Sequence, residues 1–295
     1  MPNLRDIKQR ITSTASTRQI TRTMEMVATA KIRKAQDRIE SARPYALAMM
    51  EVLGNVARFT GGASHPLLEE HETRKRVVVI AVASDRGLCG AFNSNILRLT
   101  EQIVREEREN GVETDIIAVG KKAIAYFRYR GIEPIASYRD LTDKPAITDA
   151  RSIATRVIDG YTAGEIDAVK MVFNRFRNVA DQVPEIHDLL PIHPDVVQAA
   201  AAELKVNPEY VFEPSASQVL ERLLPTYVET LVYRALLESA ASEQGARRKA
   251  MKSATDNAGE MITTLTRTYN RARQGAITNE IAEIVGGAAV LEKKK

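Results

Sequence analysis

Small and apolar residues recur along the first part of the chain at steps of three and four positions. They fall at Ala28, Ile32, Ala35, Ile39, Ala42, Ala46, Met49, Leu53 and Val56. This heptad spacing is typical of a helix that packs against a second helix. It predicts an N-terminal coiled-coil helix over residues 1–58, ended by Gly61-Gly62. Pro44 lies inside this helix, and we expect a kink there because proline removes a hydrogen bond.

The middle of the chain has a different pattern. Arg76–Ala83 is a continuous β-branched run, typical of a strand buried on both faces. Further along, the pattern predicts helices at Asn93–Glu109, Lys121–Arg130 and Thr148–Ala163, strands at Thr114–Val119, Ile132–Ile135 and Ala168–Phe173, and a further segment at Val183–Leu190. This alternation predicts a central α/β domain over residues 75–195 with a Rossmann-like parallel sheet.

The helical pattern returns over residues 215–290. Ser215 and Gln218 have the spacing of a capping box. A stripe of small residues then follows at Ala235, Ser239, Ser242, Ala246, Ala250 and Ala254. Because the N-terminal helix has a matching stripe, we expect the two helices to form an antiparallel coiled coil with the α/β domain at one end. The C-terminal helix is predicted to be longer by roughly 15–20 residues, and most of its length to project beyond the domain.

Composition narrows the class of protein. The longest unbroken apolar run, Val77–Ala83, is too short to span a bilayer, which takes about 20 residues. The single cysteine excludes an internal disulfide framework. Residues 1–35 are basic and rich in Ser and Thr, which resembles an organellar transit peptide. The apolar period continues past residue 35 without a break, and this favours the basic start of a helix.

Two turns after predicted strands could bind phosphate. The segment Asp85–Gly90 lies where a doubly wound fold has its phosphate-binding turn, but only Gly87 and Gly90 of the glycine fingerprint are present. A structural turn is the favoured interpretation and a nucleotide site the alternative. The second turn, Gly120-Lys121-Lys122, lacks the spacing and the hydroxyl residue of a P-loop.

Other reactive residues have equally weak contexts. Cys89 has no local partner of the kind a nucleophile needs, and a buried apolar role is favoured. Four possible metal ligands follow no standard spacing and are interpreted as polar loop residues: His187, Asp188, His193 and Asp195. We therefore expect no catalytic site, no metal and no cofactor.

The end of the C-terminal helix is chemically unusual. Arg267 and Arg271 share one face, and Arg273 and Gln274 lie on another. This basic stripe is either a solvated face or a contact with carboxylates of a surrounding protein, and the pattern leaves both open. The tip, residues 281–290, is mostly small and apolar, which predicts an enclosing protein sleeve. Membrane insertion is the rival interpretation, but the run is short and Glu283 interrupts it.

Four segments carry a family resemblance. They are ITRTMEMVATAKIRKA at Ile20–Ala35, SDRGLCGAFN at Ser84–Asn93, SEQGARRKAMKSATDNAGEMI at Ser242–Ile262 and YNRARQGAITNEIAEIVGGAA at Tyr269–Ala289. Together, and in this order, they resemble the gamma subunit of F-type ATP synthases. The resemblance implies a central rotor shaft with no catalytic site of its own. It implies that ion flow turns a ring of c subunits, that the shaft turns with the ring, and that rotation drives the catalytic beta subunits through different nucleotide affinities.

The resemblance also implies partners and contact residues. The terminal helices would lie inside the hexamer of alpha and beta subunits, with the α/β domain against the epsilon subunit and the c ring. Contacts with the hexamer would come from Met24, Arg247, Arg273, Gln274, Thr278 and Glu280, and contacts with the c ring and epsilon from Tyr210, Phe212 and Glu213. The protein would be peripheral at the cytoplasmic face of the inner membrane, held there only through the complex.

Two other classes compete with the rotor shaft. A nucleotide-dependent enzyme with helical arms would need the glycine fingerprint, which is incomplete. A coiled-coil nucleic-acid binder would need a larger basic excess than 42 Lys and Arg against 38 Asp and Glu. We therefore expect no nucleic-acid partner.

Overall fold

The computed structural model describes residues 4–60, 65–193, 213 and 215–292. The elements are α1 (Leu4–Thr60), η1 (Pro66–Leu68), β1 (Arg76–Val82), α2 (Phe92–Glu109), β2 (Glu113–Val119), α3 (Lys121–Tyr129), β3 (Ala136–Tyr138), α4 (Ile147–Thr162), β4 (Ala168–Phe176), β5 (Gln182–Leu190) and α6 (Ala216–Glu292). The two long helices that the sequence pattern predicts are confirmed. They have 57 and 77 residues, so the C-terminal helix is the longer one, as expected.

Both long helices contain a proline. α1 continues through Pro44 and α6 through Pro225, so neither residue ends its helix. The kink expected at Pro44 stays a prediction. At the start of α6, the Ser215 hydroxyl oxygen accepts a hydrogen bond from the Gln218 amide at 3.3 Å, which is half of the predicted capping box.

The five strands form one sheet in the order β3-β2-β1-β4-β5. β1 pairs in parallel with β2 and β4, and β2 pairs in parallel with β3. The predicted parallel sheet is confirmed for β1 to β4, and the segment Val183–Leu190, for which no direction was predicted, lies in β5, which pairs antiparallel with β4. A short hairpin joins these two strands, and a parallel strand would instead need a longer crossover connection.

The third strand also differs from its prediction. The segment Ile132–Ile135 was expected to be a strand, but β3 begins at Ala136. The amide of Ile132 bonds the Phe127 carbonyl and thereby closes the turn after α3. The segment is therefore a connection between α3 and β3, in which Ile132 is half-buried and Ile135 is exposed, and the strand begins after it.

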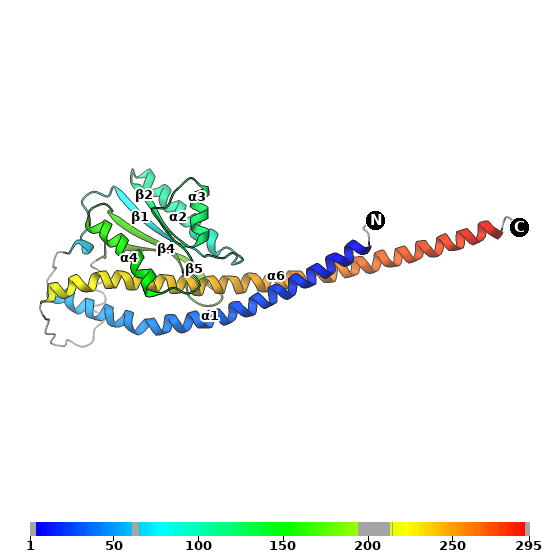
Figure 1. Ribbon diagram of the computed structural model, residues 1–295, viewed down its shortest axis with the longest axis horizontal. Coiled ribbons are helices and arrows are strands. Elements are labelled where there is room, and N and C mark those ends of the chain that lie inside the picture. The colour runs from blue at the N-terminus through cyan, green and yellow to red at the C-terminus, as the bar shows by residue number, and fades with distance from the viewer. Residues whose placement is uncertain (1–3, 61–64, 194–212, 214, 293–295) are drawn as a thin grey trace. The chain divides into compact units, whose positions relative to one another are not determined.

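Two apolar cores lie on opposite faces of the sheet. β1 serves both, because Val78, Ile80 and Val82 belong to one core while Val77 and Val79 belong to the other. The first core contains residues of α1, α4 and α6, and the second contains residues of α2 and α3 (Figure 1). The strand is therefore buried on both sides, as its uninterrupted apolar sequence predicts.

The chain divides into two compact units, and both long helices contribute to each. The larger unit, residues 28–247, holds the sheet together with the later part of α1 and the earlier part of α6. The smaller unit holds residues 1–27 and 248–295.

In the larger unit, α1 and α6 run side by side in opposite directions. Leu53 and Val56 of α1 belong to the same core as Leu224 and Val228 of α6. From Ala235 to Gly245, every residue of α6 is buried. A helix buried on all sides over three turns is enclosed by other parts of the fold.

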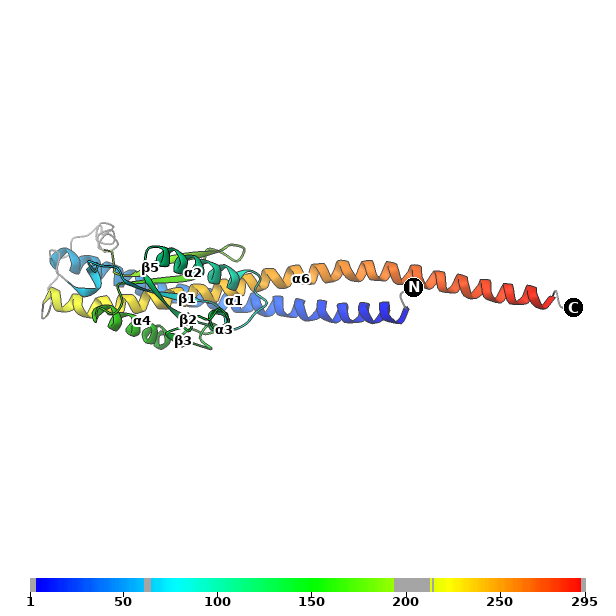
Figure 2. The same ribbon diagram turned by 90° about the horizontal axis from the view of Figure 1, so that it is seen from above.

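In the smaller unit the two helices are again antiparallel (Figure 2). The Thr255 hydroxyl donates to the Thr21 hydroxyl at 2.8 Å, and both side chains are buried. Within this unit α6 extends past the beginning of α1, and its side chains from Arg273 to Gly286 are all exposed. Among residues 4–60, 65–193 and 215–292, none of the helices has a long enough apolar stretch to cross a membrane.

Candidate partner-contact surfaces

The exposed end of α6 carries four of the residues expected to contact partners. Arg273, Gln274, Thr278 and Glu280 are all exposed on the helix. The Thr278 hydroxyl donates to the backbone carbonyl of Gln274 at 2.9 Å. These side chains offer both hydrogen-bond donors and acceptors to a neighbouring molecule.

Large apolar side chains lie among these polar ones. Ile277, Ile281, Ile284 and Val285 are 46%, 56%, 66% and 62% exposed. Exposing these side chains to water is unfavourable by about 25 cal/mol for each Å² of apolar surface. This mixed apolar and polar helix is therefore suited to an enclosing protein surface.

Met24 lies in the N-terminal part of α1 and is half-buried. Its neighbours Met26 and Val27 are more than half exposed. A flexible thioether and two further apolar side chains therefore lie on the accessible surface of this helix. Such a surface can adapt its packing to a partner.

Arg247 differs from the other expected contacts because it is buried. Only 7% of the residue is exposed. Its guanidinium is 2.6 Å from the Glu243 carboxylate and donates to the backbone carbonyl of Gly87 at 3.2 Å. The structure therefore directs Arg247 inward, toward its own chain.

The expected contacts near the c ring and epsilon are less well defined. Glu213 is exposed and lies just before α6. Tyr210 and Phe212 lie outside the described residues.

The turn after β1 is stabilised by its own side chains. The Asn93 side-chain oxygen accepts hydrogen bonds from the amide and the hydroxyl of Ser84, each at 2.9 Å. The Asn93 side-chain nitrogen donates to the Cys89 sulfur at 3.2 Å. Cys89 is buried, as expected, and burial raises the pKa of its thiol. These contacts favour the interpretation of Asp85–Gly90 as a structural turn.

Asp85 connects three parts of the α/β domain, although no sequence motif marks it. One carboxylate oxygen accepts the backbone amides of Lys121 and Asp140 at 3.0 and 3.1 Å. The other accepts the amide and hydroxyl of Thr142 at 3.3 and 2.9 Å. Burial opposes its charge, but these hydrogen bonds outweigh burial and lower the pKa of Asp85.

This carboxylate lies at the N-terminus of α3, which begins at Lys121. A helix N-terminus is where a phosphate group would bind in a nucleotide site. Gly120 precedes the helix with φ +93°, and an added Cβ would overlap the Ala83 carbonyl. The Gly120-Lys121-Lys122 turn is therefore accounted for by close packing and by an internal anion.

The residues considered as metal ligands have separate partners. The Lys170 ammonium is 2.9 Å from the Asp188 carboxylate. The His193 ring lies 3.9 Å from the Glu70 carboxylate. Burial lowers the pKa of His187, and Asp195 lies outside the described residues. Within the described part of the chain, no three His, Cys, Asp or Glu side chains gather as a metal site would require.

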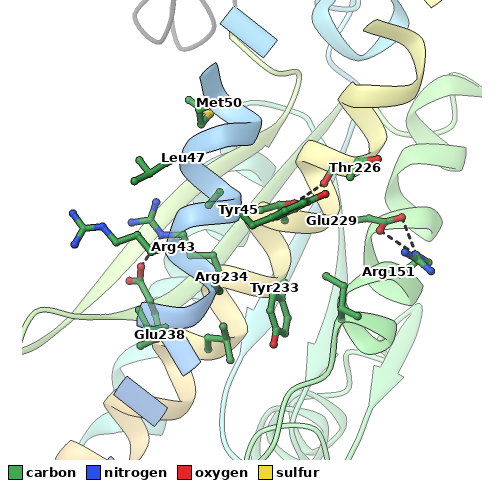
Figure 3. A pocket seen from close by; sticks show the side chains of 16 residues that line it. Arg43, Tyr45, Leu47, Met50, Arg151, Thr226, Glu229, Tyr233, Arg234 and Glu238 are labelled. Atoms are coloured by element: carbon green, nitrogen blue, oxygen red, sulfur yellow. Dashed lines mark hydrogen bonds and ion pairs between the residues drawn. The ribbon is translucent and has the colours of Figure 1, made fainter. Parts of the chain in front are cut away.

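A groove of about 690 Å³ lies between α1, α4 and α6 of the larger unit (Figure 3). Apolar side chains such as Leu47 and Met50 line it together with Tyr45. At its border, the Arg151 guanidinium of α4 is 3.0 Å from the Glu229 carboxylate of α6. The lining of the groove is therefore a mixture of apolar and charged side chains.

Comparison with known proteins identifies the family of the chain. A family model described as ATP synthase matches residues 3–291. The ATP synthase gamma chain of Desulforamulus reducens is 51% identical over 292 residues, covering 99% of this chain and 100% of the relative. That of Pelotomaculum thermopropionicum is 48% identical with the same coverage.

Solved structures show the same fold. A chain from the central stalk and c-ring structure of Tetrahymena thermophila mitochondrial ATP synthase has a TM-score of 0.58 at 27% identity, covering 80% of this chain and 99% of that chain. A chain from the rotor of Euglena gracilis mitochondrial ATP synthase has a TM-score of 0.64 at 20% identity, covering 93% and 98%, and shows the fold alone. By the family model and by relatives matched over their full length, the chain belongs to the gamma-chain family of F-type ATP synthases.

Proposed function

We propose that this protein is the central rotor shaft of an F-type ATP synthase, coupling ion-driven rotation to ATP synthesis or hydrolysis on other subunits. The chain is a non-catalytic subunit of the complex. The observation that carries the proposal is the end of α6, where every residue from Arg273 to Gly286 is exposed and several of them have large apolar side chains. A surface of this kind is stable in a complex that encloses it.

The mechanism is coupling by differential contact. A partner can shift the conformational equilibrium of another protein only if it binds the two states with different affinity. The exposed helix is not symmetric around its axis, because Ile277, Ile281 and Ile284 recur at steps of four and three positions and therefore share one face. As such a helix turns inside a ring of catalytic subunits, each subunit meets a different face at each angle.

We assign the hexamer contacts to Met24, Arg273, Gln274, Thr278 and Glu280, all of which are exposed or half-exposed. The enclosing partners would be the alpha and beta subunits. The epsilon subunit and the c ring would contact the region around Glu213, in the chain segment that precedes α6. The protein would then be peripheral to the membrane, at the cytoplasmic face of the inner membrane.

Reconstitution tests the proposal. Purified alpha and beta subunits should gain ATP hydrolysis when this chain is added, and a bead attached to the α/β domain should rotate in one direction. The isolated chain should hydrolyse no ATP. The proposal fails if alpha and beta assemble and work at the full coupled rate without this chain.

A further inference from the structure

The most deeply buried part of α6 lies close to Arg247, which is the last residue of α6 that belongs to the larger unit. Every residue from Ala235 to Gly245 is buried, and burial continues at Arg247. Arg248 and Ala250 are half-buried and Lys249 is exposed. The α/β domain therefore packs around a short segment of the helix, and Arg247 is the last buried residue of that segment.

Three parts of the α/β domain contact this segment. The Ser242 hydroxyl donates to the backbone carbonyl of Asn174, in β4, at 3.0 Å. The Gln182 side chain, at the start of β5, packs so closely on Gly245 that an added Cβ would lie 2.8 Å from its nitrogen. Arg247 donates to the Gly87 carbonyl in the turn after β1 at 3.2 Å.

The Arg247 contact depends on a buried ion pair. Glu243 lies one helical turn earlier, and the side chains of Glu243 and Arg247 are 4% and 9% exposed. Burial raises the pKa of Glu243, and the nearby Arg247 opposes that shift. The second carboxylate oxygen of Glu243 has no hydrogen-bond partner among the described residues. Removing Arg247 would leave a buried carboxylate without its cation, which is strongly unfavourable.

The turn that Arg247 contacts is otherwise accessible. Arg86 is exposed, Leu88 is 63% exposed, and Leu88 has a φ of 63°, which is unfavourable for a branched side chain. Internal hydrogen bonds fix the Ser84 and Cys89 ends of the turn. The Gly87 carbonyl, between them, is held by a residue of α6.

We propose that Arg247 is a positioning residue: Glu243 orients its guanidinium, and the guanidinium fastens the turn at Gly87 to α6. The contact fastens the α/β domain to the part of α6 that lies in the larger unit. The expected effect of this contact on coupling rests on the proposed rotor function. In a rotor, a loose attachment between the α/β domain and α6 would dissipate torque inside the chain. This role differs from a direct contact of Arg247 with the surrounding subunits.

Glu243 separates these two roles of Arg247. It is 3% exposed, so a partner subunit cannot reach it, while an internal role requires it. Arg247→Met removes the charge and keeps much of the side-chain length. Glu243→Gln keeps the shape and weakens the pair. Arg248→Met, at the next and half-exposed position, is the matched control.

The first measurement is amide hydrogen exchange of residues 84–92 in the full chain. We expect Arg247→Met and Glu243→Gln to exchange at least fivefold faster than the Arg248→Met control, and Arg247→Lys to lie between. The second is ATP-driven ion pumping per ATP hydrolysed in the assembled complex. We expect at least a twofold loss in both pair variants and none in the control.

Exchange equal to that of the control in both pair variants would overturn the proposal. So would a pumping loss in Arg247→Met that is absent from Glu243→Gln, since Arg247 would then act on a partner directly. If Arg247→Met does not fold, Arg247→Lys and Glu243→Gln, which change the volume little, decide the question. If this chain supports no coupling at all in the complex, the rotor proposal fails while the exchange result still tests the internal contact.

Discussion

Replacing Asp85 by Asn tests how the carboxyl ends of the strands are held together. The Asp85 carboxylate accepts four hydrogen bonds, three from backbone amides and one from a hydroxyl. An Asn side chain has one acceptor oxygen, so it can keep one pair of these bonds. Its amide group would face the donors of the other pair.

The size of the effect follows from the bonds lost. A hydrogen bond to a charged group contributes about 1.5–3 kcal/mol. Two lost bonds would cost about 3 kcal/mol, but Asp85 is partly exposed and water will replace part of the loss. We therefore expect Asp85→Asn to lower the free energy of unfolding by about 2 kcal/mol at neutral pH.

The effect should depend on pH. The pKa of Asp85 is lowered from its ordinary value of 3.8 in the folded protein. Its contribution to stability is therefore complete above that value and is lost as the pH falls through the folded-state pKa. The Asn variant has no charge to lose. The difference between the two proteins should stay constant from about pH 8 to 5 and shrink below about pH 4.

Urea unfolding at a series of pH values measures this difference. The chain has no Trp, so near-ultraviolet circular dichroism of the tyrosines is the suitable signal for the α/β domain. Asp140→Asn is the control, because Asp140 forms an exposed ion pair with Lys121 and such pairs contribute less than about 1 kcal/mol. An Asp85→Asn effect no larger than the control, or one that persists unchanged to pH 3, would refute the argument.

Three further changes have clear expectations. Gly120→Ala should abolish folding of the α/β domain, because φ is +93° and the new Cβ would overlap the Ala83 carbonyl; soluble expression with a native near-ultraviolet spectrum would contradict this. Thr255→Val removes the buried hydrogen bond to Thr21 and should cost about 1 kcal/mol in thermal unfolding, whereas an unchanged melting temperature would show that the bond contributes nothing. Burial and nearby carboxylates raise the pKa of Tyr161 to about 12, so its stabilising contribution is complete below pH 10 and is lost as the pH rises toward 12. Burial also raises the pKa of Tyr227, so spectrophotometric titration should show a late-ionising component that becomes smaller in Tyr161→Phe; an identical titration curve in the variant would disprove the assignment.

Local patterns predicted the main elements well. The heptad spacing of α1 and the apolar run of β1 each describe a periodicity that one element must satisfy by itself. The sequence pattern did not determine two features of the sheet, because neighbouring strands decide them. β5 pairs antiparallel with β4, and β3 begins later than the apolar segment suggested, because pairing partners are chosen by the whole sheet.

The candidate contact residues divide in the same way. Arg273, Gln274, Thr278 and Glu280 are exposed, as a helix without a facing helix requires. Arg247 has a similar sequence context, yet it is buried against Gly87 and Glu243. The Glu and Arg four residues apart were visible in the sequence as a possible ion pair. The burial of this pair could not be predicted from the sequence, since it depends on a turn 160 residues away in the chain.

The sequence by itself therefore determined the two long helices, the buried central strand and the family. It also located the apolar segment for which an enclosing partner is predicted. These follow from periodicity, composition and motifs, which act over a few turns of helix or one strand. Only the tertiary structure decided the direction of the edge strand, the role of Asp85 at the start of α3, and the burial of the Glu243–Arg247 pair. Each of these depends on groups from distant parts of the chain meeting at one point, and hydrogen bonds and charges have their effect only at that short range.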